Sequence, residues 1–204
     1  MTGDHTEEEP MSAAPTLPSR QEWTVEDLGE LPRDLRYELI NGRLIVPSPV
    51  PAHQDLAFEI GFALRAACPP DFLVSTDQSL RINRRNEPRP DLVGIRIEHY
   101  GRTPVPVEDA VLAVELVSEH SEFRDMVEKA RVYADAGLPA YWVVDQNRPE
   151  ISLTEMVLGP SKRSYEISNH TTGVFSVDAP WPITIDLPQL SARRAAILER
   201  IRLR

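Results

Sequence analysis

The sequence predicts an α/β domain built on a mixed β-sheet flanked by helices, with a β-hairpin near its N-terminus. Segments of helical and of strand periodicity follow one another along the 204 residues in the order helix, hairpin, helix, several strands, helix, strand, hairpin, helix. The hairpin is indicated by Asn41-Gly42 between two β-prone runs, because both turn residues of a two-residue hairpin must accept a positive φ.

The composition is that of a globular protein, with 41% apolar and 26% charged residues. The net charge of −10 excludes a protein that depends mainly on diffuse attraction to nucleic acid or anionic membranes. It leaves room for a local basic patch, or for carboxylates that reach phosphate through a metal ion. A single cysteine, Cys68, excludes an intramolecular disulfide. The chain has no apolar run long enough for a membrane span and no signal-peptide pattern, so we expect a cytoplasmic protein without a membrane partner.

Three regions differ in character. Residues 1–19 contain four acidic residues, no lysine or arginine and no apolar periodicity, so we expect a disordered acidic tail. Residues 20–190 contain the periodic segments and form the predicted folded domain. Residues 191–204 are predicted to form a basic helix with Ser191 as its N-cap.

The remaining elements follow from local signals. Thr24 is expected to cap a short helix that ends by Leu31-Pro32, and apolar residues at helical spacing predict a longer helix from Ala52 to Cys68. A strong amphipathic helix is expected over 123–134, closed by Gly137. β-prone runs predict strands at residues 72–75, 78–82, 91–97, 111–118 and 141–144, and an antiparallel hairpin at 150–157 and 163–168.

The chemically most informative residue is Glu115, in the apolar strand Val111–Ser118. A buried glutamate is costly unless a cation or a metal compensates its charge. An outward-pointing glutamate on a half-exposed edge strand is the equally weighted alternative. Asp91 opens another apolar strand and could by itself be a turn residue. If the two strands are neighbours, their carboxylates can converge on one Mg²⁺, which needs only one or two carboxylates besides water and phosphate.

Lys129 lies at the edge of the apolar stripe of the following helix, four residues after Asp125 and four before Tyr133. Its aliphatic stem can lie along the sheet and bring the ammonium to the strand ends. A surface ion pair between Asp125 and Lys129 is the alternative.

The segments "RPDLVGI" with Asp91, "VLAVELVS" with Glu115 and "FRDMVEKARVYADAGLPAYWVVD" with Lys129 resemble the Uma-type endonuclease family. So does "YELINGRLIVPSP" followed by His53-Gln54. The resemblance runs from about Trp23 to Leu190. It implies the restriction-endonuclease-like fold of the PD-(D/E)xK superfamily, with residues 20–190 as the nuclease domain.

The resemblance also implies roles for particular residues. Asp91, Glu115 and the backbone carbonyl of Leu116 would hold Mg²⁺ or Mn²⁺, and a lysine would orient or activate the attacking water. The superfamily lysine normally stands two residues after the glutamate, where this chain has Val117. In the Uma-type family that lysine is on the next helix, which implies Lys129. Glu38 matches an acid of the N-terminal hairpin and would assist at the metal.

Other residues have open roles. His53 could line the site, although a structural histidine is the more common case. Arg84, Arg85 and Arg89 precede Asp91 and are candidates for contacts with backbone phosphates, with a solvated loop as the alternative. The resemblance implies DNA as the partner and allows a homodimer. Two other functions remain: a catalytically inactive nuclease fold that binds nucleic acid or protein, as Val117 and the acidic charge suggest, and a metal-free paired-carboxylate hydrolase.

Overall fold

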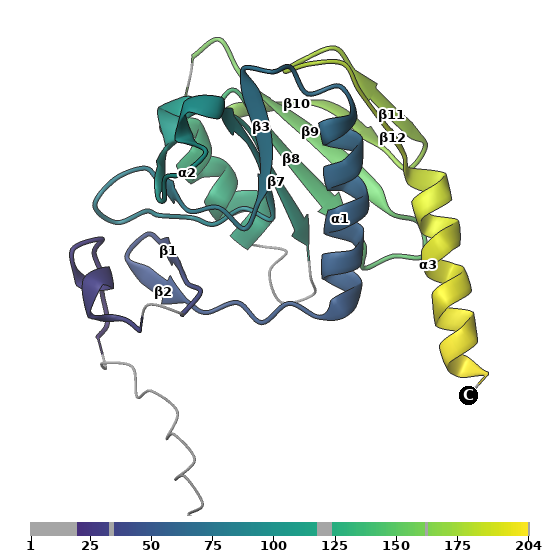
Figure 1. Cartoon of the computed structure of the whole chain (residues 1–204), viewed down its shortest axis with the longest axis horizontal. Coiled ribbons are helices and arrows are strands. Elements are labelled where there is room, and N and C mark those ends of the chain that lie inside the picture. The colour runs from purple at the N-terminus through teal and green to yellow at the C-terminus, as the bar shows by residue number, and fades with distance from the viewer. Residues whose placement is uncertain (1–19, 33–34, 118–123, 162, 204) are drawn as a thin grey trace, which may run out of the picture.

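The computed structural model describes residues 20–32, 35–117, 124–161 and 163–203 (Figure 1). The predicted tail over residues 1–19, the strand end at Ser118 and the helix residue Phe123 lie outside these ranges. A six-stranded sheet forms the centre, in the order β10-β9-β8-β7-β5-β3. Its strands are β3 (Phe72–Thr76), β5 (Leu92–Arg96), β7 (Ala110–Val117), β8 (Ala140–Asp145), β9 (Ser152–Leu158) and β10 (Tyr165–Thr171).

The sheet is mixed, as predicted. β7 and β8 run parallel, whereas the other neighbouring strands run antiparallel. The parallel pair requires a crossover, and the helical segment between β7 and β8 provides it. Leu92 pairs with Val114, so Asp91, one residue earlier, reaches the position opposite Glu115. The two strands predicted to bring these acids together are therefore neighbours.

Each face of the sheet has its own apolar layer. On one face, α1 (Pro51–Ala66) and the hairpin of β11 (Val174–Val177) and β12 (Ile183–Asp186) pack against alternate sheet residues, including Val114 and Leu116. The other face carries Ala113 and Val117 and is covered by α2 (Ala130–Asp135). Figure 1 shows α1 in front of the sheet with the C-terminal helix α3 beside it.

The N-terminal hairpin is confirmed. β1 (Glu38–Ile40) pairs antiparallel with β2 (Arg43–Ile45). The turn residues Asn41 and Gly42 have φ values of 51° and 78°, the left-handed region that this turn requires. A Cβ at this position would strain the backbone and would lie 2.9 Å from Arg85 Nη2, so the guanidinium would have to move.

The helix predicted after Thr24 is shorter than expected. It is a single 3₁₀ turn, η1 (Asp27–Glu30), and its N-cap residue is Glu26. Thr24 does not cap it, because the Thr24 hydroxyl and N–H both donate to Asp27 Oδ2, at 2.7 and 2.8 Å. Leu28 and Leu31 pack with Trp23 and Leu39 in a small core beneath the hairpin.

The helix that carries Lys129 begins with a π-helical turn, η4 (Arg124–Lys129), and continues as α2. π-turns are rare and occur frequently at functional sites. Gly137, with φ of 80°, follows the end of the helix as predicted.

The C-terminal helix α3 (Leu187–Arg202) begins four residues earlier than predicted. Its N-cap is Asp186, whose Oδ1 accepts the N–H of Gln189 at 2.9 Å. Ser191 is therefore not the cap. Its hydroxyl donates to the Leu187 carbonyl and accepts the N–H of Ile151, an interaction that anchors the helix to the loop before β9.

The remaining elements are short. The strand predicted at 78–82 is reduced to β4 (Leu80–Arg81), which pairs in parallel with β6 (Val105–Pro106). Two further 3₁₀ turns are η2 (Ile97–His99) and η3 (Val107–Asp109). Among the described residues, no helix combines the length and the apolar character needed to cross a membrane.

Candidate active site

A buried ammonium group joins two of the predicted acids. Lys129 Nζ lies 2.8 Å from Glu38 Oε2 and 2.9 Å from Glu115 Oε1. The three residues are 1%, 5% and 3% exposed, so the charges are removed from water together. Breaking such a buried pair leaves an uncompensated charge, which is strongly destabilising. The glutamate in the apolar strand therefore points inward and is compensated by Lys129, rather than pointing outward from an edge.

Lys129 reaches Glu115 on the sheet face that α2 covers. Side chains alternate along β7, so Glu115 and Val117 share a face. Val117 packs there in the same apolar cluster as Tyr133 of α2. A lysine at position 117 would project from this same face. Lys129, from the covering helix, thus approaches Glu115 from the face to which position 117 also points.

Tyr133 also contacts Glu115. Its hydroxyl donates to Glu115 Oε1 at 3.3 Å, and its side chain is fully buried. Burial raises the pKa of Tyr133 well above its ordinary value, and the nearby Glu115 carboxylate raises it further. The hydroxyl therefore remains a donor. From the sequence, Tyr133 was assigned only to the apolar stripe of the helix. Its position one turn after Lys129 could have indicated the contact with Glu115.

Asp91 is held from two sides. Its Oδ2 accepts the backbone N–H of Leu116 at 2.7 Å, and its Oδ1 lies 2.9 Å from His53 Nε2. His53 is in the first turn of α1, so this contact ties α1 to the start of β5 and to β7. The Asp91 side chain is 25% exposed, which makes it more accessible than Glu115.

The two contact groups meet on consecutive residues of β7. Glu115 belongs to the group of Lys129, Glu38 and Tyr133, whereas Leu116 belongs to the group of Asp91 and His53. Four of the predicted residues, Glu38, Asp91, Glu115 and Lys129, are therefore gathered at the same end of β7. The Leu116 carbonyl was predicted to be a metal ligand, whereas the contact with Asp91 is made by the Leu116 N–H. The ligand role of the carbonyl therefore stays a prediction.

The predicted phosphate-binding arginines contact the N-terminal segment. Arg84 Nε lies 3.2 Å from Glu26, and Arg85 donates to the Asn41 carbonyl at 3.1 Å. Arg89 donates to the carbonyls of Tyr37 and Asp77. The side chains of Arg84 and Arg85 are 72% and 50% exposed, whereas that of Arg89 is 19% exposed. Contact with phosphate stays a prediction for all three.

The donor chemistry at this place suits a hard divalent cation. Asp91 and Glu115 supply carboxylate oxygens from opposed strand positions, and Mg²⁺ binds through one or two carboxylates while it keeps several waters. Within the described ranges, no three His, Cys, Asp or Glu side chains form a ligand cluster. A cation held by Asp91 and Glu115 would have to complete its coordination with water or phosphate oxygens, and the ligand role of both residues stays a prediction.

A family model with the description "Putative restriction endonuclease", the Uma2 model, matches residues 25–184. The chain belongs to the Uma2 family. The match includes Glu38, Asp91, Glu115 and Lys129, whereas α3 lies beyond its end. Family and fold together indicate a restriction-endonuclease-like nuclease.

A solved structure supports the fold of this Uma2 member. It is the crystal structure of a putative nuclease belonging to DUF820 from Anabaena variabilis ATCC 29413. The similarity has a TM-score of 0.61 at 13% sequence identity, and it covers 76% of this chain and 89% of that one. No curated protein matches the sequence.

Proposed function

We propose that the chain is a metal-dependent endonuclease that hydrolyses DNA phosphodiester bonds at Asp91, Glu115 and Lys129. The observation that carries the proposal is the Lys129 ammonium, buried against Glu115 on the strand whose next residue binds Asp91. Two carboxylates and an amine from separate elements would have little reason to share one strand end in a purely structural core. Buried ionisable side chains that separate elements bring together are candidates for a functional site.

Asp91 and Glu115 would hold Mg²⁺ or Mn²⁺, with the Leu116 carbonyl as a further ligand. Such an ion, when bound, neutralises charge on a phosphodiester and makes bound water a better nucleophile. The protein would supply the rest. The Lys129 ammonium would orient the attacking water and stabilise negative charge that develops on the phosphate.

Three further residues would contribute indirectly, by holding the side chains of Lys129, Glu115 and Asp91 in place. Glu38 would hold the Lys129 ammonium in place, at 2.8 Å from Nζ. Tyr133 would fix one oxygen of Glu115, and His53 would fix one oxygen of Asp91. These are positioning residues. The exposed guanidinium groups of Arg84 and Arg85 would contact phosphates beside the scissile group.

The test is nicking of supercoiled plasmid DNA with Mg²⁺ or Mn²⁺. Asp91→Asn and Glu115→Gln keep the shape of the side chains and remove their charge, so both should abolish cleavage. Glu155→Gln is the matched control, because Glu155 is an 8% exposed acid on β9, two strands from β7, and accepts the hydroxyl of Ser168. It should cleave like the wild type.

Two results would overturn the proposal. One is equal cleavage by the wild type and both site variants. The other is cleavage by the wild type that persists when a chelator removes the metal. Calorimetry with Mn²⁺ adds a measurement that does not depend on the DNA chosen. A wild-type protein that binds no Mn²⁺ at millimolar concentration would favour the alternative of a catalytically inactive binding module.

A further inference from the structure

The segment before the N-terminal hairpin carries two acids that pair with Arg84 and Arg85. Glu26 Oε2 lies 3.2 Å from Arg84 Nε. Glu22 Oε1 lies 3.1 Å from Arg85 Nη2. A carboxylate offers a guanidinium the same kind of charge-assisted hydrogen bond as a phosphate does. The two arginines for which phosphate contacts are proposed thus already have anionic partners within the chain.

The backbone of this segment is docked on the loop and the hairpin that surround the arginines. The Val25 N–H donates to the Arg84 carbonyl at 2.9 Å, and the Trp23 N–H donates to the Gly42 carbonyl at 2.7 Å. The Trp23 side chain is buried in the small core beneath the hairpin. These anchored residues lie between the two acids in the sequence, so the fold itself sets both carboxylates beside the arginines.

The two ion pairs lie at the surface. The side chains of Glu22 and Glu26 are 71% and 62% exposed, and their arginine partners are exposed as well. An exposed ion pair is weak, and salt in the solution screens it further. A phosphate group can therefore displace either carboxylate, so the pairs can compete with a ligand without closing the surface to it.

Two neighbouring arginines are neutralised in the same way. Arg36, two residues before β1, pairs with Asp77. Arg43 of β2 pairs with Glu128. Their guanidinium groups are exposed, but each has a carboxylate beside it rather than open solvent alone. This part of the surface would therefore attract phosphates only weakly while its own acids stay in place.

We infer that Glu22 and Glu26 form an autoinhibitory contact, which occupies Arg84 and Arg85 until DNA phosphates displace the two carboxylates. The inference rests on the proposed function, since that function assigns phosphate contacts to these arginines. Phosphate binds only to the fraction of molecules in which a pair is open, so each closed pair lowers the apparent affinity for DNA. The two acids thus limit DNA binding and take no part in hydrolysis.

Fluorescence anisotropy of a fluorescein-labelled DNA duplex tests the inference on the full chain. A chelator is present, so the measurement does not depend on hydrolysis. The variant with Glu22→Gln and Glu26→Gln should bind the duplex about threefold to tenfold more tightly than the wild type at low salt, because two exposed ion pairs no longer compete. The gain should shrink as salt is added, because salt weakens the same pairs in the wild type.

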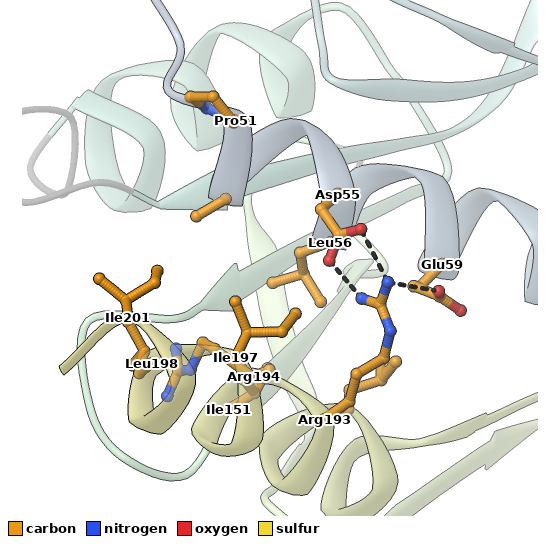
Figure 2. Close-up of a pocket in the computed structure, with 12 residues that line it drawn as sticks. Pro51, Asp55, Leu56, Glu59, Ile151, Arg193, Arg194, Ile197, Leu198 and Ile201 are labelled. Carbon is orange, nitrogen blue, oxygen red and sulfur yellow. Dashed lines mark hydrogen bonds and ion pairs between the residues drawn. The ribbon is translucent and has the colours of Figure 1, made fainter. Parts of the chain in front are cut away.

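A charge-matched control separates this contact from a general effect of net charge. Arg193 of α3 pairs with Asp55 and lies 3.6 Å from Glu59, both on α1 (Figure 2). Asp55→Asn with Glu59→Gln therefore removes two acids and frees one exposed arginine. The β1–β2 hairpin and α3 lie at opposite sides of the molecule (Figure 1), so this variant should bind the duplex nearly as the wild type does. An equal gain in both variants would overturn the inference.

A second control removes the arginines. In a chain with Arg84→Gln and Arg85→Gln, the substitutions Glu22→Gln and Glu26→Gln should give no further gain, because the groups that they release are gone. A gain that persists in this background would overturn the inference, and so would an unchanged affinity of the variant that lacks only the two acids. All the substituted side chains are at least 37% exposed, so the variants should remain folded, which circular dichroism checks.

Plasmid nicking with Mg²⁺, measured on the same variants, distinguishes this inference from the proposed function. Tighter DNA binding by the variant with Glu22→Gln and Glu26→Gln, without cleavage by any form of the chain, would contradict the nuclease and support the autoinhibitory contact. Metal-dependent nicking by the wild type, with equal DNA affinities for the wild type and that variant, would support the nuclease and overturn the contact.

Discussion

Lys129 meets Glu115 on the face of β7 that also carries Val117. Val117 is 1% exposed among apolar side chains. The ammonium beside Glu115 therefore comes from the covering helix, and it reaches the carboxylate from the face to which position 117 also points.

This relationship predicts that a lysine at position 117 can replace Lys129 as the source of the ammonium beside Glu115. Lys129→Met should abolish plasmid nicking, and Val117→Lys in the Lys129→Met background should restore measurable cleavage, because position 117 projects beside Glu115. Val117→Lys alone should be less stable than the wild type, since the longer side chain overpacks the apolar cluster in which Val117 is 1% exposed. Nicking rates and urea unfolding of the three variants check both expectations. A folded double variant with no cleavage would show that position 117 cannot supply the ammonium.

The buried Lys129 predicts a large stability effect. Lys129→Met leaves Glu38 and Glu115 without their shared cation, and removal of one partner from a buried pair costs about 3–5 kcal/mol of unfolding free energy. Adding Glu38→Gln should recover part of this loss, because one uncompensated charge is then gone. Urea unfolding at neutral pH measures both. Arg131→Met is the control: it removes a cation of the same helix whose side chain is 84% exposed, and it should leave stability nearly unchanged.

Local signals in the sequence were enough for most of the elements. Asn41-Gly42 specified the hairpin because few other pairs accept two positive φ values, and Gly137 specified the helix end for a similar reason. The start of α3 was missed because both Asp186 and Ser191 are suitable N-cap residues. It is the Asp186 side chain that accepts an N–H of the first turn. β11 and β12 were missed as well. Their core residues, such as Phe175 and Ile185, are stabilised by packing on α1 and the sheet rather than by a local pattern.

In the candidate site, too, the sequence indicated some of the residues but not the contacts between them. Glu115 was indicated by its unfavourable placement, since an acid in an apolar strand requires compensation, whereas Asp91 and Lys129 were assigned roles by the resemblance to the Uma-type family. The partners were harder to find because they depend on contacts between distant segments. His53 approaches Asp91 only because α1 lies across β5 and β7, and the Glu38 carboxylate reaches Lys129 only once the hairpin has docked. No local pattern encodes these distances.

The contact between His53 and Asp91 predicts an effect on metal affinity, if the proposed site is correct. Loss of a partner that orients a ligand typically weakens binding about 10–100-fold. His53→Ala should weaken Mn²⁺ binding by that factor in calorimetry, while its unfolding transition remains cooperative. His170→Ala is the control, because His170 pairs with Thr154 on the outer strands. Equal Mn²⁺ affinities for His53→Ala and the wild type would exclude a positioning role for His53.

Tyr133 predicts how stability depends on alkaline pH. Its pKa is raised in the folded state, first by burial and then by Glu115, so the folded protein retains a proton that the unfolded chain releases near pH 10. The corresponding stability is complete below about pH 10 and is lost as the pH rises toward the folded-state pKa, at about 1.4 kcal/mol per pH unit.

Tyr133→Phe should therefore lower stability by about 1 kcal/mol at pH 8, through the lost hydrogen bond, and should lose less stability between pH 10 and 11 than the wild type. Urea unfolding across this range tests the difference, with Tyr100→Phe, which removes an 84% exposed ring's hydroxyl, as the control. Parallel pH profiles for Tyr133→Phe and the wild type would show that the Tyr133 hydroxyl is not shielded from solvent in the folded protein.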